Sequence, residues 1–166
     1  MSIPLSDDDW FNIDEYDRWS FEGNIWTRTD GDDVLQLSIN PCEYGLGLFT
    51  CASHRSDETL GSAFGRILMA YITRSDALAY ARSLGRNDIG VFARSDPAVK
   101  PFTYAVVEVA PPFFYANHAE EGHRLCNTIM RPNGRVQVSI KADGKGRRIP
   151  SGTELRWDYY DQLYCL

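Results

Sequence analysis

The 166-residue sequence lacks an excess of basic charge, because its acidic residues outnumber its basic ones. It has 23 Asp and Glu residues against 17 Lys and Arg residues, which gives a formal net charge of −6. Tight binding to bare nucleic acid needs a basic footprint, so we expect no direct contact with nucleic acid. The same charge suits a basic protein or peptide as the partner.

The sequence also lacks the segments that mark membrane and secreted proteins. No apolar run approaches the roughly 20 residues of a membrane-spanning helix. The opening MSIPLSDDDW carries three consecutive Asp residues, whereas a signal peptide has a cationic start and an apolar centre. We therefore predict an intracellular protein, in the nucleus or the cytoplasm, that makes no contact with a membrane.

Cysteines are few, and none of them forms a Cys-x-x-Cys pair. The four are Cys42, Cys51, Cys126 and Cys165. Zinc fingers and ribbons are built on such pairs, so neither is expected. Reduced and mostly buried thiols are the expected state of these side chains.

What the sequence does contain is a series of short, strand-like apolar segments. Strands are predicted at residues 33–39, 45–52, 65–72 and 102–110. Asn40-Pro41 should end the first of these strands and Pro111-Pro112 the last. Residues 127–141 predict a hairpin, because alternating apolar residues follow Asn133-Gly134, a pair that suits a tight turn.

One helix stands out among these strands. Residues 75–85 have apolar side chains at helical spacing, with Ser75 as the expected N-cap and Gly85 just past the expected end. Residues 53–63 predict a loop. The pattern indicates a mainly β or α+β domain of several short strands and small sheets, with one or two short helices.

We assign residues 34–166 to this domain and treat residues 1–33 as an acidic and aromatic N-terminal segment. That segment is expected to pack on the domain or to flank it, either as a short helix capped by Ser6 or as an extended arm. The sequence shows no internal repeat and leaves the oligomeric state open.

The stretch FFYANHAEEGHRLCNT, residues 113–128, has the composition of a metal site but not the spacing. His118 and His123 are five residues apart, whereas a metalloprotease helix places its two histidines four apart. The cysteine pair of the zinc deaminases is also missing. We predict no metal site, and we expect Glu120, Glu121 and His123 to lie in a solvated loop.

Two glycine-containing stretches also fall short of common catalytic motifs. The Gly-x-Gly of residues 45–47 has neither the third glycine nor the following helix of a dinucleotide site. In GSAFG, residues 61–65, the serine is misplaced for a nucleophile elbow.

Taken in order, the motifs of residues 40–160 resemble those of the SET-domain protein lysine methyltransferases. The family has a Gly-x-Gly motif, an apolar strand ending near a Tyr, an aromatic-x-Asn-His motif, and an Ile-x-x-Gly-x-Glu-Leu segment leading to Asp-Tyr. The matching residues here are Gly45-Leu46-Gly47, Tyr71, Tyr115-Ala116-Asn117-His118, and Ile149–Leu155 through Asp158-Tyr159. Asn127 stands where the family often has an Asn that opens the next strand.

The resemblance implies a SET-type fold, in which the C-terminal segment threads through a loop beside Asn-His. It also implies S-adenosylmethionine as the methyl donor and a lysine of a basic protein, such as a histone tail in chromatin, as the acceptor. Gly45, Leu46, Gly47, Tyr115, Asn117 and His118 would then bind the donor. Tyr159 would be the catalytic tyrosine, and Tyr71, Tyr104, Trp157 and Tyr160 would line the lysine channel.

The chain departs from the family pattern at several positions. Phe114 replaces the usual Arg or Lys, Ala119 replaces Ser, and Trp157 replaces the common Phe or Tyr. The cysteine-rich zinc segments that flank many family domains are missing, so Tyr160, Leu163 and Tyr164, or a partner subunit, would have to close the lysine channel.

These departures leave two alternatives to the enzyme open. One is a catalytically degenerate SET-like domain that acts as a protein- or peptide-binding module. The other is an unrelated β-rich domain, in which Gly45–Gly47 would lie far from Asn117-His118.

Overall fold

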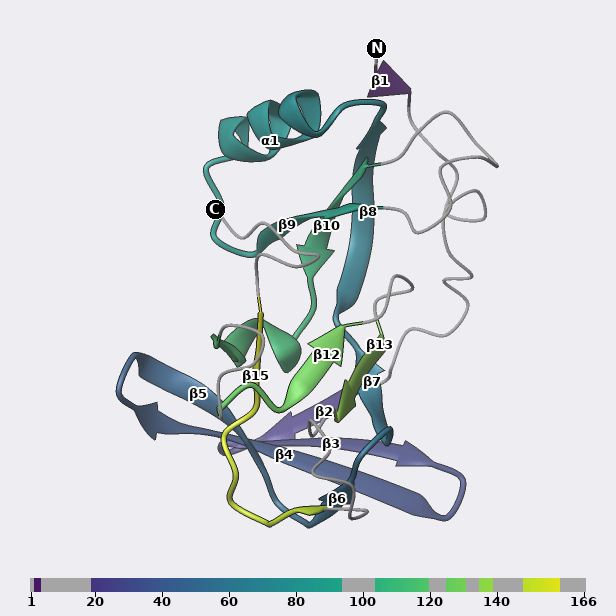
Figure 1. The fold of residues 1–166 in the computed structure, drawn as a ribbon. Coiled ribbons are helices and arrows are strands. Elements are labelled where there is room, and N and C mark those ends of the chain that lie inside the picture. Colours follow the sequence, from purple (N-terminus) through teal and green to yellow (C-terminus); the bar gives the residue numbers. More distant parts are fainter. Residues whose placement is uncertain are drawn as a thin grey trace.

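The structure is a computed structural model that describes residues 2–3, 19–93, 104–119, 125–130, 135–138 and 148–158. These residues are mostly β-strand, arranged as several small sheets, with one α-helix at one end (Figure 1). The mainly β fold class predicted from the sequence is therefore confirmed. In the described part of the chain, no helix has both the length and the apolar character needed to cross a membrane.

A four-stranded antiparallel sheet forms the end of the molecule opposite the helix (Figure 1). Its order is β2 (Trp19–Glu22), β3 (Ile25–Asp30), β4 (Asp33–Cys42) and β5 (Gly45–Thr50). The predicted end of a strand before Asn40-Pro41 is wrong, because β4 continues to Cys42. Its pairing with β3 stops at Ser38, so Pro41 borders β5 alone and lies near the strand end, where proline is tolerated.

The strands β2 and β3 were not predicted from the sequence. Trp19 of β2 packs against the main core, where its ring meets that of Phe113 edge-on at a centroid distance of 6.0 Å. Residues 19–30 mix polar and aromatic residues, because most of their side chains remain at least partly exposed. The sequence therefore shows no alternating apolar pattern that would predict these strands. The proposed helix or arm within residues 4–18 lies outside the described residues.

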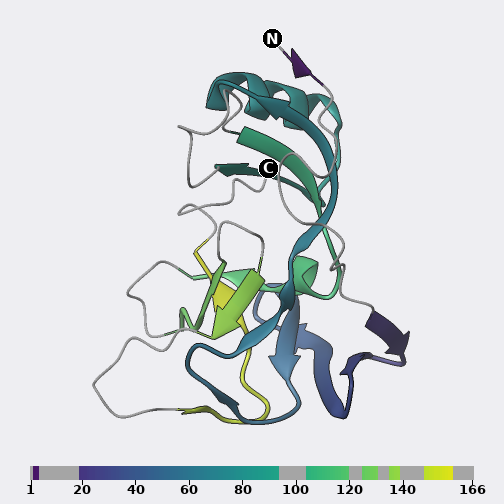
Figure 2. The same ribbon diagram turned by 90° about the vertical axis from the view of Figure 1, so that its right-hand side faces the viewer.

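A second four-stranded sheet lies under the helix, in the order β1 (Ser2–Ile3), β8 (Phe64–Tyr71), β10 (Tyr104–Val109), β9 (Ile89–Ala93). Turning the view shows the long strand β8 running from the lower sheets into this upper sheet (Figure 2). The predicted strands 65–72 and 102–110 are confirmed as β8 and β10.

The helix α1 (Arg74–Ser83) confirms the helix prediction, with a different cap. Ala77 and Ala81 are fully buried, and both belong to a cluster with Val91 of β9. The N-cap is Thr73, not Ser75. The Thr73 hydroxyl accepts a hydrogen bond from the Asp76 amide (3.2 Å) and donates one to the Asp76 carboxylate (2.8 Å). Gly85 has a φ of 62° just beyond the helix, as a C-terminal cap requires.

Shorter strands fill the space between the two sheets. In one small sheet β7 (Thr59–Ser62) pairs with β13 (Arg135–Val138), which pairs with β12 (Thr128–Met130). In another, β6 (His54–Arg55) pairs with β14 (Arg148–Ile149). The predicted hairpin of residues 127–141 is confirmed in its strand pairing, and its turn at Asn133-Gly134 lies outside the described residues.

The prediction of a loop at residues 53–63 is wrong, because β6 and β7 lie there. Their partners are more than 70 residues further along the chain, so no local pattern marks these strands.

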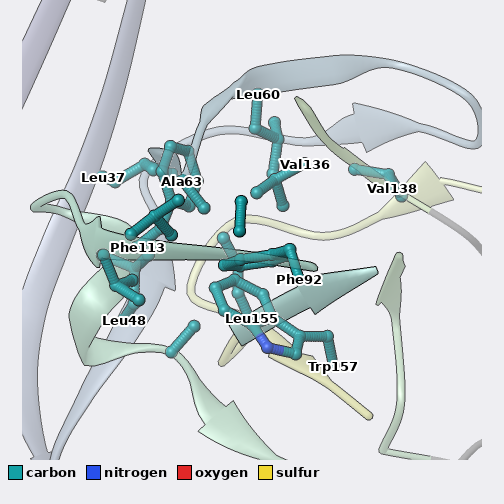
Figure 3. Close-up of a cluster of buried hydrophobic side chains, with 14 of the residues drawn as sticks. Leu37, Leu48, Leu60, Ala63, Phe92, Phe113, Val136, Val138, Leu155 and Trp157 are labelled. Carbon is teal, nitrogen blue, oxygen red and sulfur yellow. The ribbon is translucent and has the colours of Figure 1, made fainter. Parts of the chain in front are cut away.

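The last elements bring two distant segments side by side. The 3₁₀ turn η3 (Phe113–Tyr115) leads into β11 (Asn117–His118), which pairs in parallel with β15 (Arg156–Trp157). Phe113, Leu155 and Trp157 are almost completely buried and lie in one core with Phe92 and Leu48 (Figure 3).

Phe113→Ala should lower the free energy of unfolding by about 3–5 kcal/mol, because it removes a fully buried ring of η3 that packs against Trp19 of β2. Phe21→Ala is the matched control, since 53% of the Phe21 side chain is exposed and its main contact is the Trp26 ring. Its loss should stay below about 1.5 kcal/mol. Urea denaturation of the two variants checks the difference, and equal losses would contradict this account of the core.

Candidate functional site

One side chain, Asn117, joins three segments that are far apart in the sequence. Its Nδ2 donates to Glu154 Oε1 at 2.9 Å, to the Leu46 carbonyl at 3.2 Å and to Cys42 Sγ at 3.3 Å. The β4–β5 turn, β11 and the segment before β15 therefore meet at this amide. An unrelated fold with Gly45–Gly47 far from Asn117 is excluded, because Leu46 lies between those two glycines.

The surroundings also decide which way the Asn117 amide points. A carboxylate and a backbone carbonyl can only accept, so the NH2 group of Asn117 must face them and its Oδ1 must face away. In the described part of the chain, no group donates a hydrogen bond to that Oδ1. The site therefore offers one oriented acceptor to a ligand.

The Glu154 carboxylate is held in its ionised form. Burial raises its pKa, but the hydrogen bonds from Arg156 and Asn117, the charge of Arg156 and the hydrogen bond from Cys42 together leave the pKa below its usual value. Arg156 Nη2 lies 2.6 Å from Glu154 Oε2, and 15% of the Glu154 side chain is exposed. Asn117 and Arg156 therefore bond to different oxygens of the Glu154 carboxylate.

Gly47 is required because the polar cluster approaches its backbone closely. A Cβ atom at this position would lie 2.8 Å from Glu154 Oε1 and 3.1 Å from Cys42 Sγ. Gly45 is required for a different reason, since its φ of 102° is rarely adopted by residues with a side chain. The two glycines of the motif therefore have separate structural roles.

Asn127 fixes the segment that carries Glu154 and Arg156. Its Nδ2 donates to the Glu154 carbonyl at 2.7 Å, and its Oδ1 accepts from the Arg156 amide at 3.0 Å. The backbone amide of Asn127 also donates a hydrogen bond to the Arg156 carbonyl. These bonds hold the backbone of residues 154–156 independently of its side chains.

The other predicted site residues fall into three groups. Tyr115 and His118 flank Asn117 and are half-buried. The side chain of Trp157 is 2% exposed and packs in the main core. Tyr71 and Tyr104 face each other across the β8–β10 pair, in the cluster that contains Ala77 and Ala81 of α1.

Several predicted residues fall outside the described part of the chain. These are Tyr159, Tyr160, Leu163 and Tyr164, with Glu120, Glu121 and His123 of the stretch 113–128. Their predicted roles, like the channel roles of Tyr71, Tyr104 and Trp157, stay predictions. Among the residues that the structure does describe, no group of three or more Cys, His, Asp or Glu side chains could hold a metal ion.

Sequence reasoning missed the roles of Cys42, Glu154 and Arg156 in this cluster. Glu154 could have been found, because it lies inside the Ile149–Leu155 motif. Cys42 and Arg156 carry no such signal, since they reach the cluster only through the β4–β5 turn and the parallel β11–β15 pair.

A surface hollow of about 720 Å³ opens beside Phe114, between the α1–β9 connection and η3. Its other lining residues are Gly85, Arg86, Asn87, Asp88, Val109 and Pro111. None of these belongs to the Asn117 cluster, so the hollow and the cluster are distinct features.

Comparison with known proteins identifies the fold. No family model and no curated protein matches the sequence. Among solved structures, the crystal structure of CpSET8 from Cryptosporidium matches with a TM-score of 0.51 and 18% sequence identity. The match covers 75% of this chain.

The chain has a SET-like fold. It spans 57% of the length of CpSET8, so the likeness covers part of that protein only. The structural match and the Asn117 cluster both agree with the motif order read from the sequence.

Gly47→Ala should destabilise the protein by about 1–3 kcal/mol, because the added methyl group must push Glu154 or Cys42 out of place. Leu46→Ala is the neighbouring control. The Leu46 side chain is 50% exposed and its carbonyl is retained, so the change should stay within about 0.5 kcal/mol. Thermal and urea unfolding measure both, and a neutral Gly47→Ala would show that the cluster tolerates a Cβ there.

Proposed function

We propose that this chain is a SET-type, S-adenosylmethionine-dependent methyltransferase that acts on lysine side chains of a basic protein. The observation that carries the proposal is the Asn117 side chain, which links the Gly-x-Gly turn to the Glu154 segment in a SET-like fold. Three motifs of the resemblance thus converge on one amide.

The cluster fits the amino-acid end of S-adenosylmethionine. The Oδ1 of Asn117 can accept a hydrogen bond from an ammonium group, because Glu154 and the Leu46 carbonyl hold the NH2 group of Asn117 on the other side. Gly45 leaves open space beside the turn, because a Cβ atom there would meet no described protein atom within 4 Å. We assign Gly45, Leu46, Gly47, Tyr115, Asn117 and His118 to donor binding.

The chain's residues need supply no nucleophile in this reaction. When bound, S-adenosylmethionine supplies a methyl carbon that leaves its sulfur as the lysine nitrogen bonds to it, and the sulfonium becomes a neutral thioether. Holding amine and methyl in line can lower the barrier by several kcal/mol. The protein must also favour the neutral amine, because a free lysine has a pKa of about 10.4.

Aromatic side chains would create the required lysine channel. A desolvated channel disfavours the ammonium form and lowers the lysine pKa. Tyr71, Tyr104, Trp157 and Tyr160 are proposed to line it, and the hydroxyl of Tyr159 to orient the amine. The formal charge of −6 suits a basic acceptor such as a histone tail.

S-adenosylmethionine binding by calorimetry tests the donor site. Wild type should bind, and Asn117→Ala should weaken binding at least tenfold, because the ligand loses a charge-assisted hydrogen bond. Asn24→Ala is the control, since Asn24 lies in the β2–β3 turn and its side chain bonds to Asn40 and to the Ile39 carbonyl of β4. A folded wild type that does not bind would reject the proposal.

Methyl transfer distinguishes an enzyme from the alternative, a binding module that has lost catalysis. With labelled S-adenosylmethionine and core histones as acceptor, wild type should transfer label. Tyr159→Phe should reduce transfer about 100-fold or more while S-adenosylmethionine binding stays within about threefold. Equal transfer by both proteins would remove Tyr159 from the mechanism, and donor binding without any transfer would favour the module.

A further inference from the structure

Arg156 is a buried cation beside the candidate donor site whose role neither the fold nor the motifs explain. Its side chain is 9% exposed, although arginine is usually a surface residue. One Nη atom lies 2.6 Å from Glu154, and the guanidinium lies over the Tyr44 ring, 5.2 Å from its centroid. The β11–β15 pairing places Arg156 directly opposite Asn117.

We propose that Arg156 is a positioning residue that locks the orientation of the Asn117 amide by keeping Glu154 an acceptor. This inference rests on the proposed function, because the orientation matters only if Asn117 binds the donor's ammonium group. Among the described residues, no hydrogen bond joins the Arg156 and Asn117 side chains, so Arg156 would act on Asn117 through Glu154.

The lock works through hydrogen-bond polarity. While Glu154 is ionised, it can only accept, so Asn117 must turn its NH2 group toward it and its Oδ1 toward the ligand. If Glu154 were protonated, its O–H could donate to Asn117. A flipped Asn117 amide would then be opposed by the Leu46 carbonyl, at 3.2 Å, without the help of Glu154, and it would present an NH2 group, which cannot accept a hydrogen bond from an ammonium ion.

The other groups around Glu154 show why Arg156 is needed to keep Glu154 ionised. The Leu46 carbonyl and Cys42 Sγ also accept from Asn117, but both are neutral and compete for the same two hydrogens. One other ionisable pair lies close by, because His118 of β11 follows Asn117 in the chain and its Nδ1 is 3.9 Å from Asp158 Oδ1. Among the described residues, Arg156 is the one cation that contacts Glu154.

Arginine suits this position better than lysine. Its planar guanidinium can bond to the carboxylate and stack on Tyr44 at the same time. The backbone of Arg156 is held separately by Asn127 and Thr128. Replacing the side chain should therefore alter the charge without releasing the segment.

The pH dependence of S-adenosylmethionine binding tests the lock. In wild type, the low pKa of Glu154 keeps it ionised, so binding should decline only at low pH. In Arg156→Met, burial is opposed by fewer favourable interactions, so the Glu154 pKa rises and the decline should begin at higher pH.

Three further variants sharpen the comparison. Arg156→Lys should restore the wild-type pH profile in part, since it keeps the charge but loses the planar contacts. Arg156→Met combined with Glu154→Gln should show no shifted decline, because the titrating group is gone. Arg66→Met is the matched control, since Arg66 is paired with Glu108 on an exposed surface and should leave the profile unchanged.

The side-chain amide signals of Asn117 in the donor-free protein provide a readout that does not depend on donor binding. In NMR spectra these signals should titrate at higher pH in Arg156→Met than in wild type. A folded Arg156→Met protein whose binding profile and amide signals match wild type would overturn the inference. If wild type binds no S-adenosylmethionine, the proposed function fails, and the amide titration still decides whether Arg156 controls Asn117.

Discussion

The hydrogen bonds that hold residues 150–157 between two other segments are the constraint on which the candidate site depends. On one side, Thr50 and Leu48 of β5 bond to Gly152, Thr153 and Leu155. On the other side, Asn127 bonds to Glu154 and Arg156. The interacting residues are up to 103 positions apart, so the site forms only when the domain does.

This arrangement buries the charged side chains of Glu154 and Arg156, and a buried charge destabilises the folded protein unless it is paired. Glu154 and Arg156 neutralise each other, and Asn117, Cys42 and Tyr44 satisfy or cover their remaining polar surface. The pair contributes less to stability than to geometry, because replacing buried ion pairs by apolar residues is often neutral. Its position next to the Gly-x-Gly turn agrees with a role in orienting Asn117.

The same segment also completes the core. Leu155 and Trp157 alternate with Glu154 and Arg156, so apolar side chains face Phe92 and Phe113 while the polar ones face the Asn117 cluster (Figure 3). The bulk of Trp157, which departs from the family pattern, is used in packing. The core and the site therefore share one short segment of backbone.

The sequence by itself determined the class of the fold, the helix at α1, the strands β8 and β10 and the pairing of β12 with β13. These elements have strong local periodicity or bond to near neighbours, and local pattern is what a sequence displays. The order of the motifs also indicated which residues of the Gly-x-Gly and Asn-His segments would meet.

Tertiary structure alone decided the strands β2, β3, β6 and β7 and the contents of the polar cluster. The first two carry mixed polar and aromatic residues, and the last two pair with residues more than 70 positions away, so neither case leaves a periodic trace. No sequence motif marks Cys42 or Arg156 as a site residue. They join Asn117 because a hairpin turn and a parallel pair of two-residue strands bring them there, and the polarity of the resulting contacts depends on their distance and burial in the folded chain.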